Sequence, residues 1–446
     1  MNVNIGNRMK VLKFGGTSVG SADRMKHVAR LISGGERNIV VLSAMSGTTN
    51  SLVEISDYLY KKNPDGANEV VNRLENKYMN VIKELYATEE FYAKGLEVIR
   101  SHFDYIRSFT KDLFTVFEEK VILAQGELIS TALVNNYLNE QGVKSVLLPA
   151  LDFMRTDKNN EPDPVYIKEK LTKLLEKYSD AELFITQGFI CRNAYGEVDN
   201  LLRGGSDYSA SLIGAAVEAS EIQIWTDIDG MHNNDPRFVD KTSPVRQLHF
   251  EEAAELAYFG AKILHPTCIL PAKFNNIPVR LLNTMEPEAP GTLISNDTER
   301  GKIKAVAAKD GITSIKIKSG RMLLAYGFMR KVFEIFENYQ TPVDMVTTSE
   351  VGVSLTIDNK KNLAEIIDSL KKLGTVTVDE DLCIICVVGD LDWENVGFED
   401  LALHAMREIP IRMISYGGSN YNISFLIKAS DKQQALQSLS DHLFNK

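Results

Sequence analysis

The chain has 446 residues, a formal net charge of −10 and a charged-residue content of 25%. This length predicts two or three domains, and the negative charge argues against a nucleic acid or an anionic membrane as the main partner. No apolar segment approaches the ~20 residues that span a bilayer. Residues 1–10 also lack the apolar stretch that directs secretion, so we expect a cytoplasmic protein.

The four cysteines are too few and too scattered for a disulfide framework. Cys383 and Cys386 have the spacing of redox and zinc motifs, but they lie in the apolar run 382–388, which predicts a buried strand. Residues i and i+3 of a strand face opposite sides, so we favour buried structural cysteines. The seven histidines are dispersed, and no protein metal site is expected.

Short apolar runs alternate with helical patterns over the first two thirds of the chain. The predicted strands are residues 11–14, 39–43, 146–149, 183–186, 222–226 and 279–283. They are rich in Val, Ile and Leu without polar alternation, which is typical of strands covered on both faces. The alternation predicts βαβ units and therefore an α/β fold, an αβα sandwich around a mainly parallel sheet.

Three later features complete the predicted organisation. Between residues 57 and 120, apolar residues recur at helical spacing without a strand signal, which predicts a helical insertion. Residues 286–291, Glu-Pro-Glu-Ala-Pro-Gly, are typical of a linker. The remaining chain predicts two successive ferredoxin-like βαββαβ modules. Each is too small to cover both faces of its own sheet, so we expect them to pair side by side.

The loop after the first predicted strand reads Lys-Phe-Gly-Gly-Thr-Ser at residues 13–18. Glycines permit a tight turn and a close approach of backbone N–H groups to a phosphate, and the start of the next helix favours an anion. Lys13 adds a positive charge that can follow a moving phosphoryl group. The spacing is neither a P-loop nor a dinucleotide motif, and a simple turn is the alternative interpretation.

Further polar clusters follow predicted strands or begin helices, where the ligands of open α/β sheets gather. They are residues 43–50, 125–127, 202–207, 225–230, 235–237 and 259–266. Glu127 is interpreted first as a first-turn carboxylate that stabilises a helix dipole, with binding of a substrate ammonium as the alternative. Arg203 suits bidentate recognition of a carboxylate, and Lys262 has a surface lysine as its alternative.

Together these clusters predict phosphoryl transfer to an amino acid. Lys13, Arg237 and Lys262 can neutralise a polyphosphate, and Arg203 with Glu127 can pair with the two charges of an α-amino acid. Phosphoryl transfer needs this kind of cationic positioning and little covalent chemistry.

The motifs resemble those of the aspartate kinases, which belong to the amino acid kinase family and carry C-terminal tandem ACT domains. The resemblance covers almost the whole chain in order. It is carried by KFGGTSVGS at 13–21, SAMSGTTN at 43–50, QGELIS at 125–130, RGGSD at 203–207, WTDIDG at 225–230, DPR at 235–237, FGAKILHP at 259–266 and VDMVTTSEVGVSLTI at 343–357. No further domain follows, so we expect the monofunctional form, similar to the lysine-sensitive class.

The resemblance implies phosphorylation of the β-carboxylate of L-aspartate by ATP with Mg²⁺, the first step of lysine, threonine, methionine and diaminopimelate biosynthesis. It implies catalytic roles for Lys13 and Asp207. The residues implied in aspartate binding are Ser43, Thr49, Glu127, Arg203, Gly204, Gly205 and Ser206. Those implied in ATP binding are Lys13, Gly15, Gly16, Thr17, Ser18, Thr226, Asp227, His232, Arg237 and Lys262, with His232 where relatives often carry tyrosine.

The resemblance also implies feedback by an end-product amino acid at the ACT modules, and a homodimer or larger assembly formed through them. Lysine is the first expectation and threonine the alternative. The residues implied are Met322, Ala325, Phe328, Val343, Asp344, Ser349 and Glu350. Asp344 and Glu350 would favour a lysine ammonium, and a solvated loop is the alternative for both.

The expected domains are a catalytic domain at 1–290 with the insertion at about 57–120, a first ACT module at 311–377, and a second formed by 301–310 with 378–446. Two other functions stay open, a kinase of glutamate or acetylglutamate type and a catalytically dead amino acid sensor. The ACT tail together with residues 203–207 argues against the first, and the set Lys13, Asp207 and Lys262 argues against the second.

Overall fold

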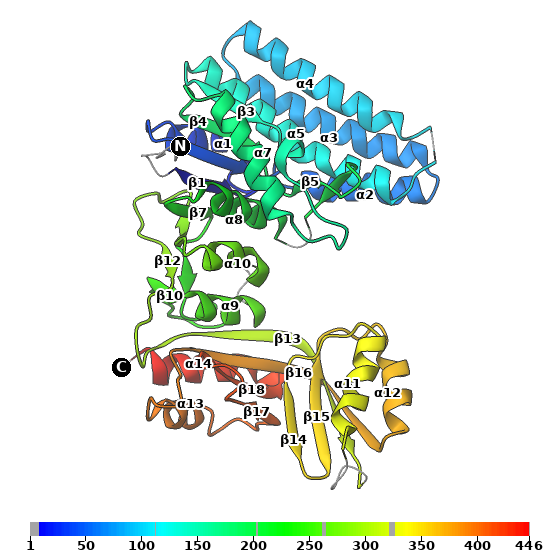
Figure 1. Ribbon diagram of the computed structural model, residues 1–446, viewed down its shortest axis with the longest axis vertical. Helices are drawn as coiled ribbons and strands as arrows, with labels where there is room; N and C mark the ends of the chain where they lie inside the picture. Colours follow the sequence, from blue (N-terminus) through cyan, green and yellow to red (C-terminus); the bar gives the residue numbers. More distant parts are fainter. Residues whose placement is uncertain (1–8, 112, 202–203, 261–264, 321–325, 446) are drawn as a thin grey trace. The chain divides into compact units, whose positions relative to one another are not determined.

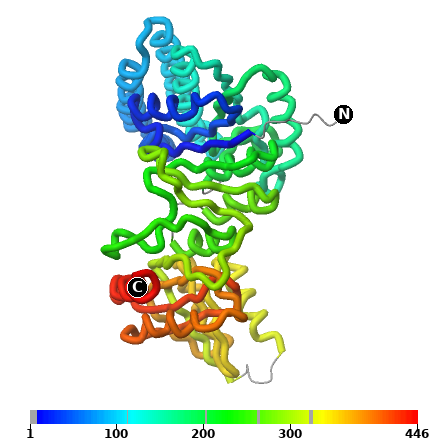
Figure 2. Tube along the Cα trace, turned by 90° about the vertical axis from the view of Figure 1, so that its left-hand side faces the viewer, coloured from blue at the N-terminus to red at the C-terminus, as the bar shows by residue number. Residues whose placement is uncertain are grey.

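The computed structural model describes residues 9–111, 113–201, 204–260, 265–320 and 326–445. The chain forms two compact units, Met1–Met231 with Leu264–Asn296, and His232–Ile263 with Asp297–Lys446. Residues 232–263 therefore belong to the second unit, although they lie within the first two thirds of the sequence. Figure 2 traces the chain with colours that follow the sequence.

The first unit is built on a mainly parallel sheet with helices on it (Figure 1). Its sheet strands lie in the order β12-β11-β7-β1-β2-β4-β3, and of these neighbours only β11 and β12 are antiparallel. The elements are β1 Lys10–Phe14, α1 Ala22–Ile32, β2 Asn38–Leu42, α2 Thr48–Tyr60, α3 Pro64–Leu85, α4 Glu89–Ser108, α5 Val116–Glu140, β3 Ser145–Leu148, α6 Ala150–Phe153, α7 Pro164–Lys177, β4 Leu183–Gln187, β5 Ile190–Arg192, β6 Val198–Asn200, α8 Gly205–Val217, β7 Glu221–Thr226, α10 Pro266–Phe274, β11 Val279–Asn283 and β12 Thr292–Ser295.

The central strands are buried on both faces. Leu12 and Phe14 of β1 pack into a core shared with α1 to α5, whereas Val11 and Ile39, which point to the other face, are also fully buried. Helix α8 packs against β1, β2 and β7. The continuous Val, Ile and Leu runs therefore arise because helices cover both sides of the sheet, and the predicted α/β fold is confirmed.

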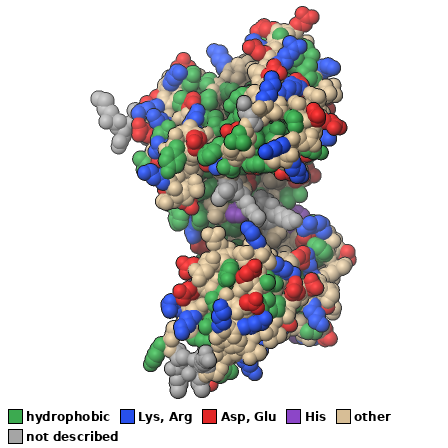
Figure 3. Space-filling model, turned by 90° about the vertical axis from the view of Figure 1, so that its right-hand side faces the viewer, with side chains coloured by type: hydrophobic (Ala, Val, Ile, Leu, Met, Phe, Trp, Pro, Cys, Tyr) green, Lys and Arg blue, Asp and Glu red, His purple; other side chains and the backbone are tan. Residues whose placement is uncertain are grey.

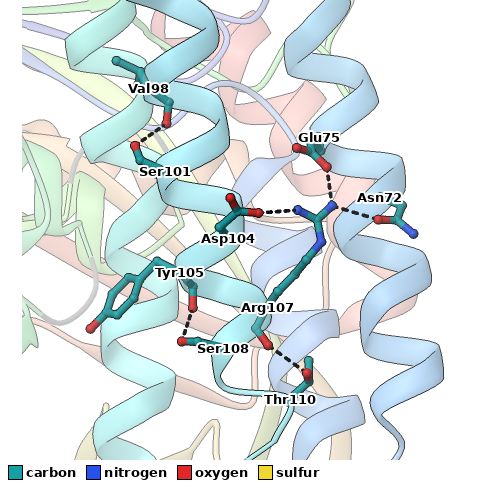
Figure 4. Close-up of polar contacts among 9 residues, drawn as sticks. All are labelled: Asn72, Glu75, Val98, Ser101, Asp104, Tyr105, Arg107, Ser108 and Thr110. Carbon is teal, nitrogen blue, oxygen red and sulfur yellow. Dashed lines mark hydrogen bonds and ion pairs between the residues drawn. The ribbon is translucent and has the colours of Figure 1, made fainter.

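Helices α2 to α5 form a bundle above the sheet, as Figure 1 shows. The apolar residues that recur at helical spacing in α3, among them Leu74 and Tyr78, are buried in its core. Arg107 near the end of α4 joins this helix to α3 (Figure 4). Its guanidinium pairs with Glu75 and donates to Asn72 Oδ1 at 2.9 Å, while Asp104 accepts from it at 3.3 Å.

Residues 286–291 differ from the prediction of a linker. They form the turn between β11 and β12, which pair antiparallel with Val279 opposite Ile294. Proline and glycine favour a tight turn as strongly as they favour a linker. The composition of this segment alone therefore could not distinguish a turn between two strands from a linker between two domains.

The second unit contains a six-stranded antiparallel sheet in the order β14-β15-β13-β16-β18-β17. Its elements are β9 Pro244–Val245, β10 Gln247–His249, α9 Phe250–Tyr258, β13 Ile303–Lys318, α11 Phe328–Asn338, β14 Val346–Ser349, β15 Gly352–Ile357, α12 Leu363–Lys371, β16 Thr375–Gly389, α13 Phe398–Ala405, β17 Met413–Ser415, β18 Asn422–Lys428, the short 3₁₀ helix η1 Ala429–Asp431 and α14 Lys432–Leu443, and β8 Met231–His232 lies at the division of the units.

The long strands β13 and β16 run through both halves of this sheet. Their pairing shifts in register around residues 309–314. On one side of the shift α11 and α12 cover a core centred on β15, and on the other α13 and α14 cover a core centred on β18. The predicted side-by-side pairing of two modules is confirmed, and the residue boundaries given for the three domains stay a prediction. Cys383 and Cys386 are buried in β16 as free thiols.

On the face drawn in Figure 3, Lys and Arg side chains are interspersed with Asp and Glu. Among the helices described, none combines the length and the apolar character needed to cross a bilayer.

Candidate active site

A cleft of 1190 Å³ lies in the first unit at the carboxyl ends of β1 and β2. Its walls are the loop after β1, the Ser/Thr-rich loop after β2, one face of α5, the β5–β6 hairpin and the start of α8. Ligands of open α/β sheets bind at this edge of the sheet. The cleft therefore gathers several clusters that are far apart in the sequence.

Lys13 and Asp207 meet in this cleft. Lys13 Nζ lies 2.8 Å from Asp207 Oδ1, and the two side chains are 12% and 14% exposed. Lys13 comes from the end of β1, and Asp207 comes from the first turn of α8. Among the described residues, no side chain caps the N-terminus of α8, so its first N–H groups remain available to an anion.

The hydroxyl-rich loop after β2 reaches the start of α8. Ser43 Oγ donates to Ser206 Oγ at 3.0 Å, which brings two predicted aspartate-binding residues together. Thr49 is exposed on the wall of the cleft, where Gly204 and Gly205 also lie. A cation that the sequence did not single out, Lys77, donates to the carbonyl of Ser46 at 2.6 Å.

Glu127 lies in the middle of α5, so the interpretation as a first-turn carboxylate is wrong. The residue is 4% exposed, and its Oε1 accepts from the backbone N–H of Ala44 at 3.2 Å. Its Oε2 is buried without a hydrogen-bond partner among the described residues. Burial raises the pKa of this carboxyl to about 7, although the Ala44 N–H acts in the opposite direction. A cationic group in the cleft would find an acceptor here.

Two further charged residues of the cleft were missed in the sequence. Lys120 Nζ lies 2.7 Å from Asp199 Oδ1, and this pair joins α5 to β6. Lys120 precedes Glu127 by seven residues, and this helical spacing places both on one face of α5. That spacing could have indicated Lys120 as a residue of the cleft. The sequence around Asp199, by contrast, does not indicate that Asp199 pairs with Lys120.

Three predicted nucleotide residues of the opening loop differ in their surroundings from Lys13 and Gly16, which line the cleft. Ser18 is 2% exposed, and its Oγ is hydrogen bonded to Thr284 Oγ1 at 2.8 Å. Thr17 is exposed, and its carbonyl accepts from Arg24 at 2.7 Å. Gly15, Thr17 and Ser18 are not among the described residues that line the cleft.

The other predicted ATP residues are divided between the units. Thr226 ends β7 in the first unit, and Asp227 beside it is exposed. In the second unit, Arg237 donates through Nε to Asp235 Oδ1 at 2.9 Å, and the ring of His232 is hydrogen bonded to Thr242 at 2.8 Å. Four predicted residues lie outside the described residues: Arg203, Lys262, Met322 and Ala325.

The remaining predicted effector residues lie in the second unit. Phe328 begins α11 and is buried, Val343 is partly buried, and Ser349 and Glu350 are exposed at the end of β14. The side chain of Asp344 is only 1% exposed and pairs with Lys309. The solvated-loop alternative is therefore wrong for Asp344, and it fits the exposure of Glu350.

Comparison with known proteins gives a consistent result along the chain. The sequence profile of the amino acid kinase family matches residues 8–283, and that of the ACT domain matches residues 385–443. Lysine-sensitive aspartokinase 3 of Escherichia coli (strain K12) is 34% identical over 458 residues, which span 97% of this chain and 99% of that protein.

Two solved structures of E. coli aspartokinase III resemble the whole fold. The structure in complex with aspartate and ADP, described as the R-state, has a TM-score of 0.84 and 33% identity over 98% of this chain and 100% of that chain. The structure in complex with lysine and aspartate, described as the T-state, has a TM-score of 0.79 and 34% identity over 98% of this chain and 99% of that chain.

Proposed function

The chain belongs to the aspartokinases of the amino acid kinase family, and we propose that it transfers the γ-phosphoryl group of ATP to the β-carboxylate of L-aspartate in the cleft of the first unit. The observation that carries this assignment is that the Lys13–Asp207 ion pair and the buried carboxyl group of Glu127 line one cleft. A relative with the same fold was solved with aspartate and ADP.

The reaction needs no general base. A β-carboxylate has an ordinary pKa of about 3.9 and is ionised at pH 7. The barrier comes from bringing one anion against another. Lys13 and the N–H groups at the start of α8 would therefore lower this barrier by stabilising the charge on the transferring group. Asp207 would position the Lys13 ammonium and would not accept a proton.

The substrate's own charges suit the remaining groups. Glu127 Oε2, which has no hydrogen-bond partner among the described residues, would accept from the α-ammonium, and Arg203 would bind the α-carboxylate. Ser43, Thr49 and residues 204–206 would complete this side of the site. An incoming ammonium would lower the pKa of Glu127 from about 7 and restore its charge.

ATP would be bound by the residues that the resemblance implies for it, among them Thr226, Asp227, His232, Arg237 and Lys262. Mg²⁺ would enter on the ATP phosphates. The ion would neutralise phosphate charge. We place the reaction in the cytoplasm and assign the domains as 1–290, 311–377, and 301–310 with 378–446.

A coupled assay of ADP release with L-aspartate, L-glutamate and N-acetyl-L-glutamate tests this proposal. Of the three acceptor substrates, we expect only L-aspartate to be phosphorylated. Hydroxylamine should trap the acyl phosphate product as a hydroxamate. A preference for either glutamate substrate would assign a different kinase of the family. ATP binding without turnover of any substrate would favour an amino acid sensor.

Feedback by lysine is the second part of the proposal, because a relative of 34% identity is lysine-sensitive and was solved with lysine. The effector would bind near Val343 and Asp344, in a homodimer formed through the ACT modules. Activity measured with lysine, threonine and methionine, singly and in pairs, tests it. We expect lysine to inhibit and to do so at lower concentration than threonine; no response to any of them would reject the regulation.

A further inference from the structure

Two helices of the bundle hold the loop after β2, residues 43–47. Helix α5 contacts the start of this loop, where Ser130 Oγ donates to the carbonyl of Ser43 at 2.8 Å. Gly126 lies close to the same segment, since a Cβ atom on it would come within 2.8 Å of the Ala44 Cβ atom. The start of the loop is therefore fixed against a helix that itself lines the cleft.

Helix α3 contacts the other end of the loop. Tyr78 is fully buried, and its hydroxyl is hydrogen bonded at 2.8 Å to Thr48 Oγ1, which is also fully buried. The residue before Tyr78, Lys77, is exposed and donates to the carbonyl of Ser46 at 2.6 Å. A hydrogen bond is stronger in the protein interior than in water, so the bond between Tyr78 and Thr48 is the main constraint from α3.

This buried bond controls how the first turn of α2 presents Thr49. Thr48 is the first residue of α2, and the N-cap is Gly47, which has no side chain to cap the first N–H groups. Neighbouring residues of a helix are about 100° apart around its axis. Burial of Thr48 therefore leaves Thr49 exposed on the wall of the cleft, and a rotation of this turn would move both residues.

Tyr78 acts on this turn through a neutral hydroxyl. Burial raises the pKa of the phenol and the charge of Glu127 adds to this effect, while the hydrogen bond to Thr48 acts in the opposite direction. Tyr78 is fully buried and is not among the described residues that line the cleft. It can therefore affect a ligand only through the segment that it holds.

We propose that Tyr78 is a positioning residue for the acceptor substrate, because it holds the first turn of α2, and with it Thr49, in the orientation that the acceptor meets. The inference rests on the proposed function, since Thr49 is taken as part of the aspartate site. It gives the helical insertion a part in substrate binding. The nucleotide should be little affected, because the pair with Asp207 fixes Lys13 independently of α3.

The kinetic test compares Tyr78→Phe with Tyr86→Phe in the full chain. Tyr86 lies in the same core, and its hydroxyl donates to the carbonyl of Leu133 at 2.9 Å. Each variant therefore removes one buried hydroxyl, but only Tyr78→Phe releases α2. We expect Tyr78→Phe to raise KM for L-aspartate about three- to tenfold, with KM for ATP and Kd for MgADP within about twofold. Tyr86→Phe should match the wild type in all three.

Thr48→Val removes the other hydroxyl of the bond and keeps the shape of the side chain. It should raise KM for L-aspartate by a similar factor, and the double variant should raise KM no further, because both changes break the same bond. Single effects that multiply in the double variant would overturn the proposal. Equal increases in KM for both substrates, an equal effect of Tyr86→Phe, or lower thermal stability with unchanged KM for L-aspartate would overturn it as well.

Hydrogen exchange in the unliganded protein gives a measurement that is independent of the acceptor. The backbone amides of residues 43–50 should exchange about three- to tenfold faster in Tyr78→Phe than in wild type or Tyr86→Phe. Unchanged exchange would overturn the proposal. If the wild type failed to phosphorylate L-aspartate, the proposed function would be wrong. Exchange would still show whether Tyr78 fixes the loop, and KM for the acceptor that the enzyme does use would replace KM for L-aspartate.

Discussion

Lys13 Nζ lies 2.8 Å from Asp207 Oδ1, and this contact joins the end of β1 to the first turn of α8. An ammonium group has three N–H donors. Lys13 can therefore keep its bond to Asp207 while it donates to a phosphate oxygen. The pair fixes the direction of a flexible side chain before a ligand arrives, which is the form of positioning that electrostatic catalysis requires.

Replacing Lys13 with alanine should lower kcat about 100- to 1,000-fold, because one preorganised charge contact to the transferring group is lost. KM for aspartate should change much less. Circular dichroism and thermal unfolding should show an intact fold. Lys173→Ala, at an exposed lysine of α7, is the matched control and should leave kcat unchanged. A Lys13→Ala enzyme with near-normal kcat would remove Lys13 from the mechanism.

Glu127 should make stability depend on pH. Its pKa in the folded protein is about 7 against an ordinary value of 4.5. The folded state therefore holds the proton more tightly than the unfolded state. The resulting contribution to the free energy of unfolding is fully present below pH 4.5 and is lost as the pH rises through 7. Glu127→Gln has no ionisable group at this position, so it does not lose stability in this way as the pH rises. The free energy of unfolding of the variant, relative to wild type, should be about 2 to 3 kcal/mol larger at pH 8 than at pH 5.

Urea unfolding at the two pH values measures this difference. Glu97→Gln, at an exposed position of α4, should show no such change between pH 5 and pH 8. A Glu127→Gln variant that is less stable than wild type at pH 8 would mean that the charged carboxylate is stabilised in the fold, contrary to the effect of its burial.

Much of the fold was predictable because the strands of the sheet are covered on both faces. Such strands are uninterrupted apolar runs, and each of the six predicted for the first unit overlaps a strand of the sheet. The start of α5 was also readable but was missed. Thr115 and Glu118 form a capping box, and this pattern before an apolar run marks a helix start. Reading it would have placed Glu127 in the helix interior.

Other features of the cleft depend on contacts between distant segments. Ser18 is turned into the core by Thr284, which lies 266 residues away. Lys120 is paired because the β5–β6 hairpin folds back over α5 and brings Asp199 to it. No local pattern of residue types encodes either contact, so the sequence could supply candidates for the site but not the pairing of their charges.

Gly196 and Gly204 allow the free-energy cost of backbone strain to be separated from the cost of overpacking. Both have positive φ, +86° and +72°. A Cβ atom at Gly204 would lie 2.5 Å from Cys268 Sγ and 2.9 Å from His265 Cβ, whereas one at Gly196 would meet nothing within 4 Å. Gly196→Ala should cost about 1 kcal/mol of unfolding free energy from backbone strain alone. Gly204→Ala should cost about 2 kcal/mol more, because overpacking adds to the strain.

Urea unfolding of both variants and of wild type gives this comparison directly. The difference between the two alanine variants is the informative quantity, since the backbone term is common to them. Equal losses of stability would mean that α10 moves away from Gly204 freely, and the turn before α8 would then not depend on glycine for close packing.

The Lys120–Asp199 pair should respond unequally to removal of its two members. The Asp199 side chain is 10% exposed and that of Lys120 is 32% exposed. Lys120→Met leaves a nearly buried carboxylate without its counterion, which should cost about 2 to 3 kcal/mol. Asp199→Asn leaves a lysine that can turn toward solvent, so its cost should be about 1 kcal/mol.

The double variant Lys120→Met with Asp199→Asn should be more stable than Lys120→Met alone, because the stranded charge is removed. Lys168→Met breaks an ion pair with Glu218 whose side chains are 56% and 75% exposed, and it should change stability by less than about 0.5 kcal/mol. The unfolding free energies of the wild type, the two single variants at Lys120 and Asp199, and the double variant form a double-mutant cycle. If Asp199→Asn proved to be the more costly single change, the burial of Asp199 would not explain the unequal response of the pair.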